Sequence, residues 1–91
     1  MLSKLPIDLD KVDKKNLDKE ILRAGLMAEY DAINLYEQMA ALAQDEKVKK
    51  VMLDVAKEEK EHVGEFETML LERDQEQVEE MAEGKKEVEE M

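Results

Sequence analysis

One short segment of the chain, residues 58–62, has the residue types of a metal site. It reads Glu-Glu-Lys-Glu-His and contains the only histidine of the 91 residues, His62, three positions after Glu59. On a helix this spacing places a carboxylate and an imidazole on one face, and helical-bundle proteins use such a Glu-x-x-His pair to hold two iron or manganese ions. A glutamate-rich helix also produces the spacing by chance, so the alternative is the solvated edge of an acidic helix.

A third candidate ligand, Glu29, lies upstream in a second apolar series. Residues 22–43 place apolar or small side chains at spacings of three and four, which is typical of one helix face, and Glu29 and Tyr36 fall in line with them. Glu59 and His62 interrupt a downstream apolar series in the same way. Carboxylates on apolar faces need a positive or protonated partner, and a metal ion is one solution. Tyr36 is placed to hydrogen-bond a ligand carboxylate, although plain core packing explains it nearly as well.

Two long helices are expected to position these side chains. Asn16 can cap a first helix that ends near Gln44, and Asp45 can cap a second helix that runs to about Arg73. The very short connection between the two predicts an antiparallel hairpin.

The hairpin geometry decides whether the candidate ligands can meet. Glu29 precedes Asp45 by nearly as many residues as Glu59 follows it. At a rise of about 1.5 Å per residue, both glutamates lie roughly 21–24 Å from the turn, so we expect them to be level with each other. His62 lies one helical turn farther along. The sequence therefore predicts that the three side chains approach one another across the hairpin.

The two ends of the chain carry weaker patterns. Residues 1–15 mix apolar and charged side chains and are expected to form an extended or flexible N-terminal arm. Asp74 can cap a short third helix, which Gly84 is expected to interrupt, leaving a frayed acidic tail. We expect no internal repeat and no second domain. The chain then divides into the arm, a hairpin over residues 16–73 and a C-terminal segment over residues 74–91.

The composition predicts an all-α protein that needs a partner. The chain carries 25 Asp+Glu against 14 Lys+Arg, with one proline, three glycines and no cysteine. The acidic balance argues against nucleic-acid binding, and the chain has no run of roughly 18 apolar residues that would predict a membrane span. The absence of cysteine excludes disulfides, rubredoxin-type iron and thiolate zinc sites, and fits a reducing cytosol. Because two helices cannot enclose a core of their own, an obligate oligomer is expected.

A two-fold dimer would meet two needs of this chain, which is too small to enclose a core and has too few ligands for a di-iron site. A di-iron site in a helical bundle takes four glutamates and two histidines, and two copies of Glu29, Glu59 and His62 supply that set. The same dimer completes a four-helix bundle. Carboxylates combined with imidazole favour iron or manganese over zinc. We therefore expect a di-iron site at the dimer interface.

Residues 28–36 and 58–62 together resemble the encapsulated ferritin family, the half-ferritins of the wider ferritin-like and rubrerythrin-like superfamily. The first segment reads Ala-Glu-Tyr-Asp-Ala-Ile-Asn-Leu-Tyr, and the resemblance extends over roughly residues 17–73. It implies a ferroxidase centre shared between two subunits, which oxidises Fe(II) to Fe(III) with dioxygen and feeds iron mineral storage. The catalytic residues that it implies are Glu29, Glu59, His62 and Tyr36.

The resemblance also implies partners and a location. Family members form annular decamers, built as pentamers of dimers, and work in the cytoplasm inside an encapsulin shell that stores the mineral. They carry an outer, metal-attracting acidic site to which Asp31 corresponds, whereas Ala28 stands where other members have an acid. Residues 84–91 do not look like the shell-targeting peptide of many members. They are more similar to archaeal members in which the ferritin-like domain is fused to the shell protein.

Two other functions fit parts of the sequence. A helical hairpin without turnover could serve as an oligomerisation or shell-tethering module. A rubrerythrin-like peroxidase would use similar ligands, but this chain has no cysteines for the usual rubredoxin electron donor. For Asp31, and for the acidic residues Glu58, Glu61 and Glu65, a solvated helix face is the simpler interpretation.

Overall fold

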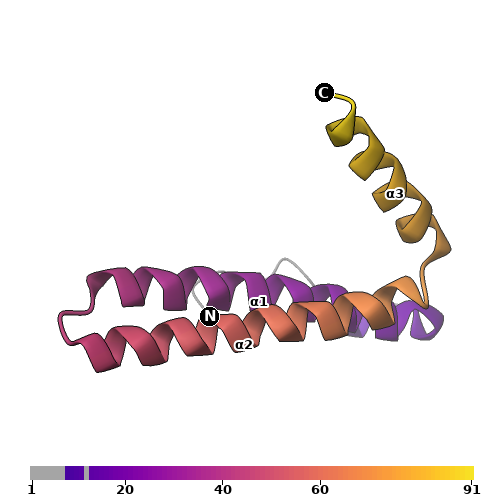
Figure 1. Cartoon of the computed structure of the whole chain (residues 1–91). Helices are drawn as coiled ribbons and strands as arrows, with labels where there is room; N and C mark the ends of the chain where they lie inside the picture. The colour runs from indigo at the N-terminus through magenta and orange to yellow at the C-terminus, as the bar shows by residue number, and fades with distance from the viewer. Residues whose placement is uncertain (1–7, 12) are drawn as a thin grey trace.

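The computed structural model describes residues 8–11 and 13–91, which form a helical hairpin with one further helix (Figure 1). The long helices are α1 (Leu17–Leu42) and α2 (Glu46–Leu71), and α3 (Gln75–Glu89) is shorter. Two short 3-10 turns, η1 (Leu9–Lys11) and η2 (Lys14–Asn16), precede them. α1 and α2 lie antiparallel and side by side. The predicted all-α fold, with an antiparallel hairpin and a shorter C-terminal helix, is confirmed.

Aspartate side chains cap the N-termini of two helices, α2 and α3. Asp45 Oδ1 accepts hydrogen bonds from the backbone N–H groups of Lys47 at 2.8 Å and Val48 at 3.1 Å. Asp74 Oδ1 accepts one from the N–H of Gln77 at 3.0 Å. Each bond satisfies a backbone donor that has no partner within the first turn of a helix. The predicted caps at Asp45 and Asp74 are therefore confirmed.

Asn16 precedes α1 without capping it through its side chain. Its φ of −107° and ψ of 2° are not the extended conformation that a capping side chain requires, because its N–H closes η2 by donating to Asp13 O at 2.8 Å. Of the expected extended or flexible arm, the part that the structure describes is not extended. There the chain turns through local bonds, such as the one from the Lys15 N–H to Asp13 Oδ1. Residues 1–7 and 12 of the predicted arm lie outside the described part.

The helix ends differ from expectation in three places. α1 ends at Leu42 and α2 at Leu71, each slightly before the predicted end. The predicted break at Gly84 is wrong, because α3 continues through this residue to Glu89. A glycine inside a helix costs only about 1 kcal/mol relative to alanine, which does not suffice to end it. Lys85 and Glu89, which are one turn apart on the continued helix, form an ion pair of 3.8 Å.

The core of the hairpin is narrow. Within the described part of the chain, the buried hydrophobic side chains are Ile33 and Ala40 from α1 and Ala56 and Leu70 from α2. Other apolar side chains, such as Val51 and Leu53, remain exposed. Two packed helices have too little facing surface to bury all their apolar residues. The hairpin therefore presents apolar surface that a second copy could cover.

Gly25 of α1 and Phe66 of α2 lie close together toward the end of the hairpin that is farther from the turn. A Cβ atom on Gly25 would lie 3.0 Å from the Cδ2 and Cε2 atoms of the Phe66 ring. That distance is well inside ordinary carbon–carbon contact of about 3.5–4.0 Å. The absence of a side chain at residue 25 thus makes room for the aromatic ring of α2.

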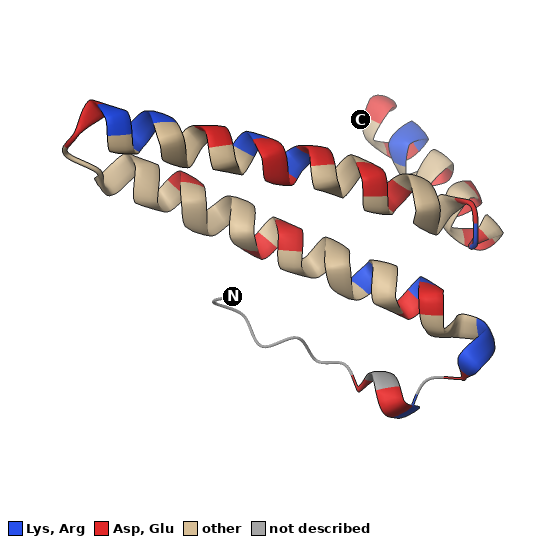
Figure 2. Cartoon of the chain, turned by 90° about the horizontal axis from the view of Figure 1, so that it is seen from below, with Lys and Arg blue, Asp and Glu red and all other residues tan. Residues whose placement is uncertain are grey.

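Charge is distributed unevenly over the two long helices (Figure 2). α2 carries both lysines and acidic residues as far as Lys60, whereas residues 27–42 of α1 include Glu29, Asp31 and Glu37 and no basic residue. The glutamate at position 29 therefore has no cation on the adjoining turns of its own helix. Separately, no helix in the described ranges is long and apolar enough to cross a membrane.

Candidate metal centre

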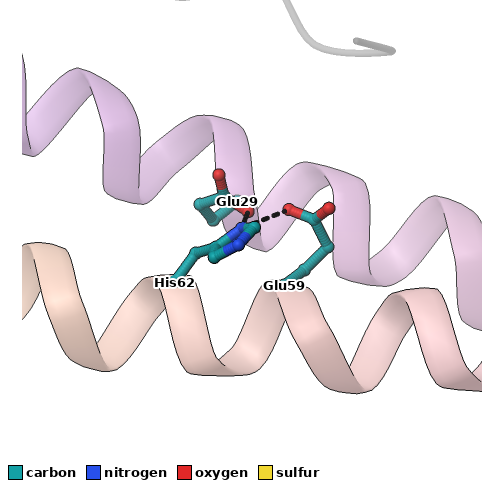
Figure 3. A group of neighbouring side chains, drawn as sticks. All are labelled: Glu29, Glu59 and His62. Atoms are coloured by element: carbon teal, nitrogen blue, oxygen red, sulfur yellow. Dashed lines mark hydrogen bonds and ion pairs between the residues drawn. The ribbon is translucent and has the colours of Figure 1, made fainter.

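Three potential metal ligands meet between α1 and α2 (Figure 3). Glu29 Oε2 lies 3.3 Å from His62 Nδ1, and Glu59 Oε2 lies 3.4 Å from the same nitrogen. One ligand atom from each residue falls within 4.8 Å of the other two. The three side chains of this Glu29–Glu59–His62 group point toward a common space between the helices.

The positions of the group follow from the hairpin. Glu59 and His62 are three residues apart on α2, so they share one face of that helix. The turn between the helices is short, and Asp45 caps α2 directly after it, which fixes the register of α1 against α2. Glu29 on α1 therefore lies opposite Glu59 and His62. The structure thus brings together the three residues that the sequence singled out as a metal set. Within the described residues, these three form the one group of at least three His, Asp or Glu side chains that lie close enough together to hold an ion.

The two carboxylates are mostly shielded from solvent and lack a fixed counter-charge. The side chains of Glu29 and Glu59 are 16% and 19% exposed. In residues 8–11 and 13–91, neither glutamate pairs with a lysine or arginine, and their ion-pair partner is His62. The nearby Lys60 is engaged with Glu37 at 2.9 Å. A protonated imidazole carries one positive charge and balances at most one of the two carboxylates.

The donor set suits a divalent cation with a preference for oxygen and imidazole nitrogen. Carboxylate oxygens and His Nδ1 are ligands for iron and manganese, and no thiolate is present to favour zinc. A divalent ion between Glu29 and Glu59 would balance the carboxylate charge that His62 does not balance. Three ligands from one chain also leave coordination positions open for a substrate molecule or for a second copy. The residues therefore fit a divalent cation such as Fe(II).

His62 is the exposed member of the group. Its side chain is 45% exposed, and it lines a surface hollow together with Asp54, Lys57, Glu58 and Glu61 of α2. Asp54 did not stand out in the sequence. The signal that could have found it is its spacing of eight residues from His62, which returns to the same helix face after about two turns. His62 thus contacts the two glutamates and also lines a hollow that three acidic residues and Lys57 share.

Two residues predicted for the site lie apart from the group. Tyr36 is half-buried on α1, about 10 Å along the helix axis from Glu29 at about 1.5 Å per residue. In the part of the chain that the structure describes, no hydrogen bond joins the Tyr36 hydroxyl to the three ligands. Asp31 follows Glu29 by two residues, so it lies about 200° around α1 and outside the group. Roles for Tyr36 and Asp31 stay predictions.

Comparisons with known proteins show which proteins this chain is similar to. A family model described as EncFtn-like matches residues 5–88. A ferritin-like–encapsulin shell fusion protein of Pyrococcus furiosus is 55% identical over 85 residues, which make up 93% of this chain and 25% of the relative. This chain thus spans about a quarter of the length of that relative.

A solved structure is similar over the whole chain. The crystal structure of an encapsulated ferritin domain from Pyrococcus furiosus matches with a TM-score of 0.85 and 54% sequence identity, and the match covers 100% of this chain and 95% of that one. The resemblance to encapsulated ferritins is confirmed, and so is the three-helix fold. The chain belongs to the EncFtn-like family.

Proposed function

We propose that two copies of this chain form a ferroxidase centre that oxidises Fe(II) to Fe(III) with dioxygen. One observation carries the proposal: Glu29, Glu59 and His62 meet within 4.8 Å, with no lysine or arginine from the described residues to balance the carboxylates. Membership of the EncFtn-like family supports it. Iron is the substrate, and each Fe(II) ion gives up one electron, so a centre that holds two ions can pass a pair of electrons to one dioxygen molecule.

The proposed centre is complete only in a dimer. One chain contributes two carboxylates and one imidazole, which is half of the four glutamates and two histidines of a di-iron bundle site. A two-fold axis beside the group would supply the other half and join two hairpins into a four-helix bundle. The dimer would also cover exposed apolar surface of the hairpin.

Each residue has a distinct proposed role. The carboxylates of Glu29 and Glu59 bind iron and offset its growing positive charge during oxidation. His62 contributes Nδ1, the nitrogen that already faces both glutamates. Tyr36 would hydrogen-bond a ligand carboxylate, and Asp31 would attract iron at an outer acidic site. These last two roles come from the family resemblance.

The proposed destination of the product is an encapsulin shell. The Pyrococcus furiosus relative is a fusion of a ferritin-like part and a shell protein, and this chain matches 25% of it. A hairpin dimer encloses no storage cavity, so oxidised iron must accumulate elsewhere. We place the chain, as an annular decamer, within such a compartment in the cytoplasm.

An iron-oxidation assay tests the proposed function. Fe(II) added without oxygen should bind at about two ions per dimer, and air should then produce ferric absorbance faster than in protein-free buffer. Glu59→Gln and His62→Ala should abolish the enhancement. Glu65→Gln is the matched control, because it removes one exposed carboxylate from the same helix that is not a member of the group.

The same assay separates the alternatives. A non-catalytic oligomerisation or tethering module would leave oxidation at the rate of the buffer, and metal analysis of protein purified without added metal would find none. A rubrerythrin-like peroxidase would oxidise Fe(II) faster with hydrogen peroxide than with dioxygen. An unchanged rate of iron oxidation in both Glu59→Gln and His62→Ala would rule out the proposed centre.

A further inference from the structure

Phe66 and Gly25 lie one helical turn from the metal group, each on its own long helix. Phe66 follows His62 by four residues on α2, and Gly25 precedes Glu29 by four residues on α1. Residues four apart on a helix are neighbours on one face. A Cβ atom on Gly25 would lie 3.0 Å from two ring atoms of Phe66, so the ring rests against the bare backbone of α1. This aromatic contact and the metal group therefore occupy adjacent levels of one helix interface.

The direction of the side chains places the ring beside the ligands. Side chains on a helix lean toward its N-terminus and cover the preceding turn. On α2, Phe66 therefore leans toward the turn that carries His62. On the antiparallel α1, Glu29 leans toward the turn that carries Gly25, and its side chain is only 16% exposed. The ring is thus placed to cover the group on the side farther from the connection between α1 and α2.

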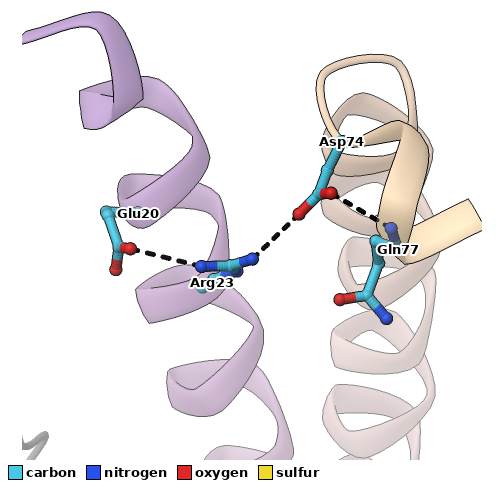
Figure 4. A network of polar contacts seen from close by, with 4 residues as sticks. All are labelled: Glu20, Arg23, Asp74 and Gln77. Atoms are coloured by element: carbon cyan, nitrogen blue, oxygen red, sulfur yellow. Dashed lines mark hydrogen bonds and ion pairs between the residues drawn. The ribbon is translucent and has the colours of Figure 1, made fainter. Parts of the chain in front are cut away.

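The far end of the hairpin is held together by polar contacts (Figure 4). Arg23 Nη2 on α1 lies 2.8 Å from Oδ2 of Asp74, in the segment that directly follows α2. Arg23 also contacts Glu20 at 3.2 Å, and Asp74 accepts a hydrogen bond from the Gln77 N–H. The network links α1 to the end of α2 close to Gly25, so the helices are tied on that side of the aromatic contact.

The two sides of the aromatic contact differ in how tightly they are packed. One turn beyond Phe66, toward the tied end, Leu70 is buried. One turn before Phe66, the side chain of His62 is 45% exposed. Close-packed interiors transmit strain instead of absorbing it. Extra volume between Gly25 and Phe66 would therefore displace the metal group more easily than the tied end.

We propose that Gly25 and Phe66 are positioning residues of the metal centre, whose contact sets the distance between α1 and α2 where Glu29 faces His62. The inference rests on the proposed function, because it takes this group to be the metal site. The ligand atoms Glu29 Oε2 and His62 Nδ1 are 3.3 Å apart. A misplacement of about 1 Å at a reacting centre can cost about 100-fold in rate. A wider interface would also favour a larger ion over a smaller one.

Co(II) and Mn(II) titrations of the full chain test the proposal. Residues that orient metal ligands contribute about 10–100-fold to affinity, so Gly25→Ala should weaken Co(II) binding at least about tenfold. Binding of Mn(II), the larger ion, should weaken less, whereas a general loss of folding would weaken both equally. Gly64→Ala is the matched control, because its Cβ meets no atom within 4 Å. It should bind both ions like the parent protein.

A compensating substitution in the ring tests the contact itself. Phe66→Leu removes the outer ring atoms and should weaken Co(II) binding several-fold. Adding Gly25→Ala to Phe66→Leu fills part of the vacated space, so it should tighten binding again, whereas independent losses would multiply. This comparison also decides the matter if Gly25→Ala alone does not fold. The proposal is overturned if Gly25→Ala/Phe66→Leu binds Co(II) no more tightly than Phe66→Leu, or if a folded Gly25→Ala protein binds Co(II) like Gly64→Ala or weakens for both ions equally.

A measurement without metal separates this proposal from the ferroxidase proposal. His62 is the only histidine, so its ring protons are identified directly by NMR. Nuclear Overhauser effects between these protons and the Cγ protons of Glu29 should weaken in Gly25→Ala and persist in Gly64→Ala. If the parent protein neither binds Co(II) nor oxidises iron, the proposed function fails and these spectra still decide the positioning. If the parent oxidises iron and the spectra of Gly25→Ala are unchanged, the positioning role alone fails.

Discussion

His62 Nδ1 lies 3.3 Å from Glu29 Oε2, although 33 residues separate them in the chain. The contact joins the single imidazole of the protein to a carboxylate that has no lysine or arginine partner in the described structure. Glu59 meets the same nitrogen from 3.4 Å. The imidazole cannot satisfy both carboxylates by charge, so the arrangement is better suited to holding a cation than to stabilising the hairpin.

Removing the charge of Glu29 should weaken metal binding more than it affects the fold. Glu29→Gln keeps the size of the side chain but replaces an anionic ligand with a neutral amide. Loss of a residue that hydrogen-bonds a metal ligand already lowers metal affinity about 10–100-fold. Loss of the ligand itself should therefore lower the metal affinity by at least about tenfold. Isothermal titration with Co(II), or with Fe(II) under anaerobic conditions, measures the change.

The control for Glu29→Gln is Glu65→Gln, which removes the same charge from an exposed position on α2. Its affinity should stay close to that of the parent protein. Equal affinities in all three proteins would mean that Glu29 is not a ligand. The melting temperature of Glu29→Gln should not fall, because the substitution relieves repulsion between two shielded carboxylates.

A methyl group at residue 25 should destabilise the hairpin. In Gly25→Ala the new Cβ would lie 3.0 Å from the Phe66 ring, so the ring or the helices must shift. Overpacking of this kind costs about 1–3 kcal/mol, although alanine recovers roughly 1 kcal/mol through its higher helix propensity. We expect a net loss in the free energy of unfolding, measured by urea denaturation followed by circular dichroism.

Gly64→Ala is the matched substitution on α2. A Cβ at this position meets no atom within 4 Å, so only the gain in helix propensity applies. Gly64→Ala should therefore stabilise the protein where Gly25→Ala destabilises it. Shifts of the same sign in both variants would contradict the close packing of Gly25 against Phe66.

The part of the site within one chain could be predicted from the sequence because it depends on helical rise alone. Counting residues outward from Asp45 places Glu29 opposite Glu59, and the structure brings both to His62. The direction of α3 could not be predicted in this way. It depends on the pairing of Arg23 with Asp74, which are 51 residues apart, and no local pattern marks that contact.

Two sequence expectations failed for local energetic reasons. Gly84 looked like a helix stop, but its cost of about 1 kcal/mol is too small to end a helix that Asp74 caps at the start. Asn16 has the residue type of a cap, but its backbone is already used in a 3-10 turn. The proposed dimer depends on contacts between copies, which a single chain does not contain, and the roles of Tyr36 and Asp31 stay predictions.

Asp74 should control the order of α3. Asp74→Asn keeps an oxygen that can accept from the Gln77 N–H but loses the ion pair with Arg23, whereas Asp74→Ala loses both. A lost cap costs about 1 kcal/mol, and a partly exposed ion pair contributes about 0.2–1 kcal/mol. Amide exchange in α3 should therefore be fastest in Asp74→Ala, intermediate in Asp74→Asn and slowest in the parent. Glu83→Gln, an exposed change on the same helix, should leave it unaltered.

Metal should strengthen association between copies. If two hairpins meet at the Glu29–Glu59–His62 group, four shielded carboxylates come together, and without a cation they repel one another. A chelator should therefore shift the protein toward monomers on dilution, and added Co(II) should reverse the shift, as measured by sedimentation velocity.

The variant Glu29→Gln/Glu59→Gln tests whether this repulsion is the cause. It removes all four charges from the proposed interface, so it should associate more readily than the parent without metal and respond little to Co(II). Glu58→Gln/Glu65→Gln removes as many charges from exposed positions on α2 and should keep the response to metal. If the chelator leaves the parent fully associated, or if Co(II) acts equally on both double variants, the group does not lie between two copies.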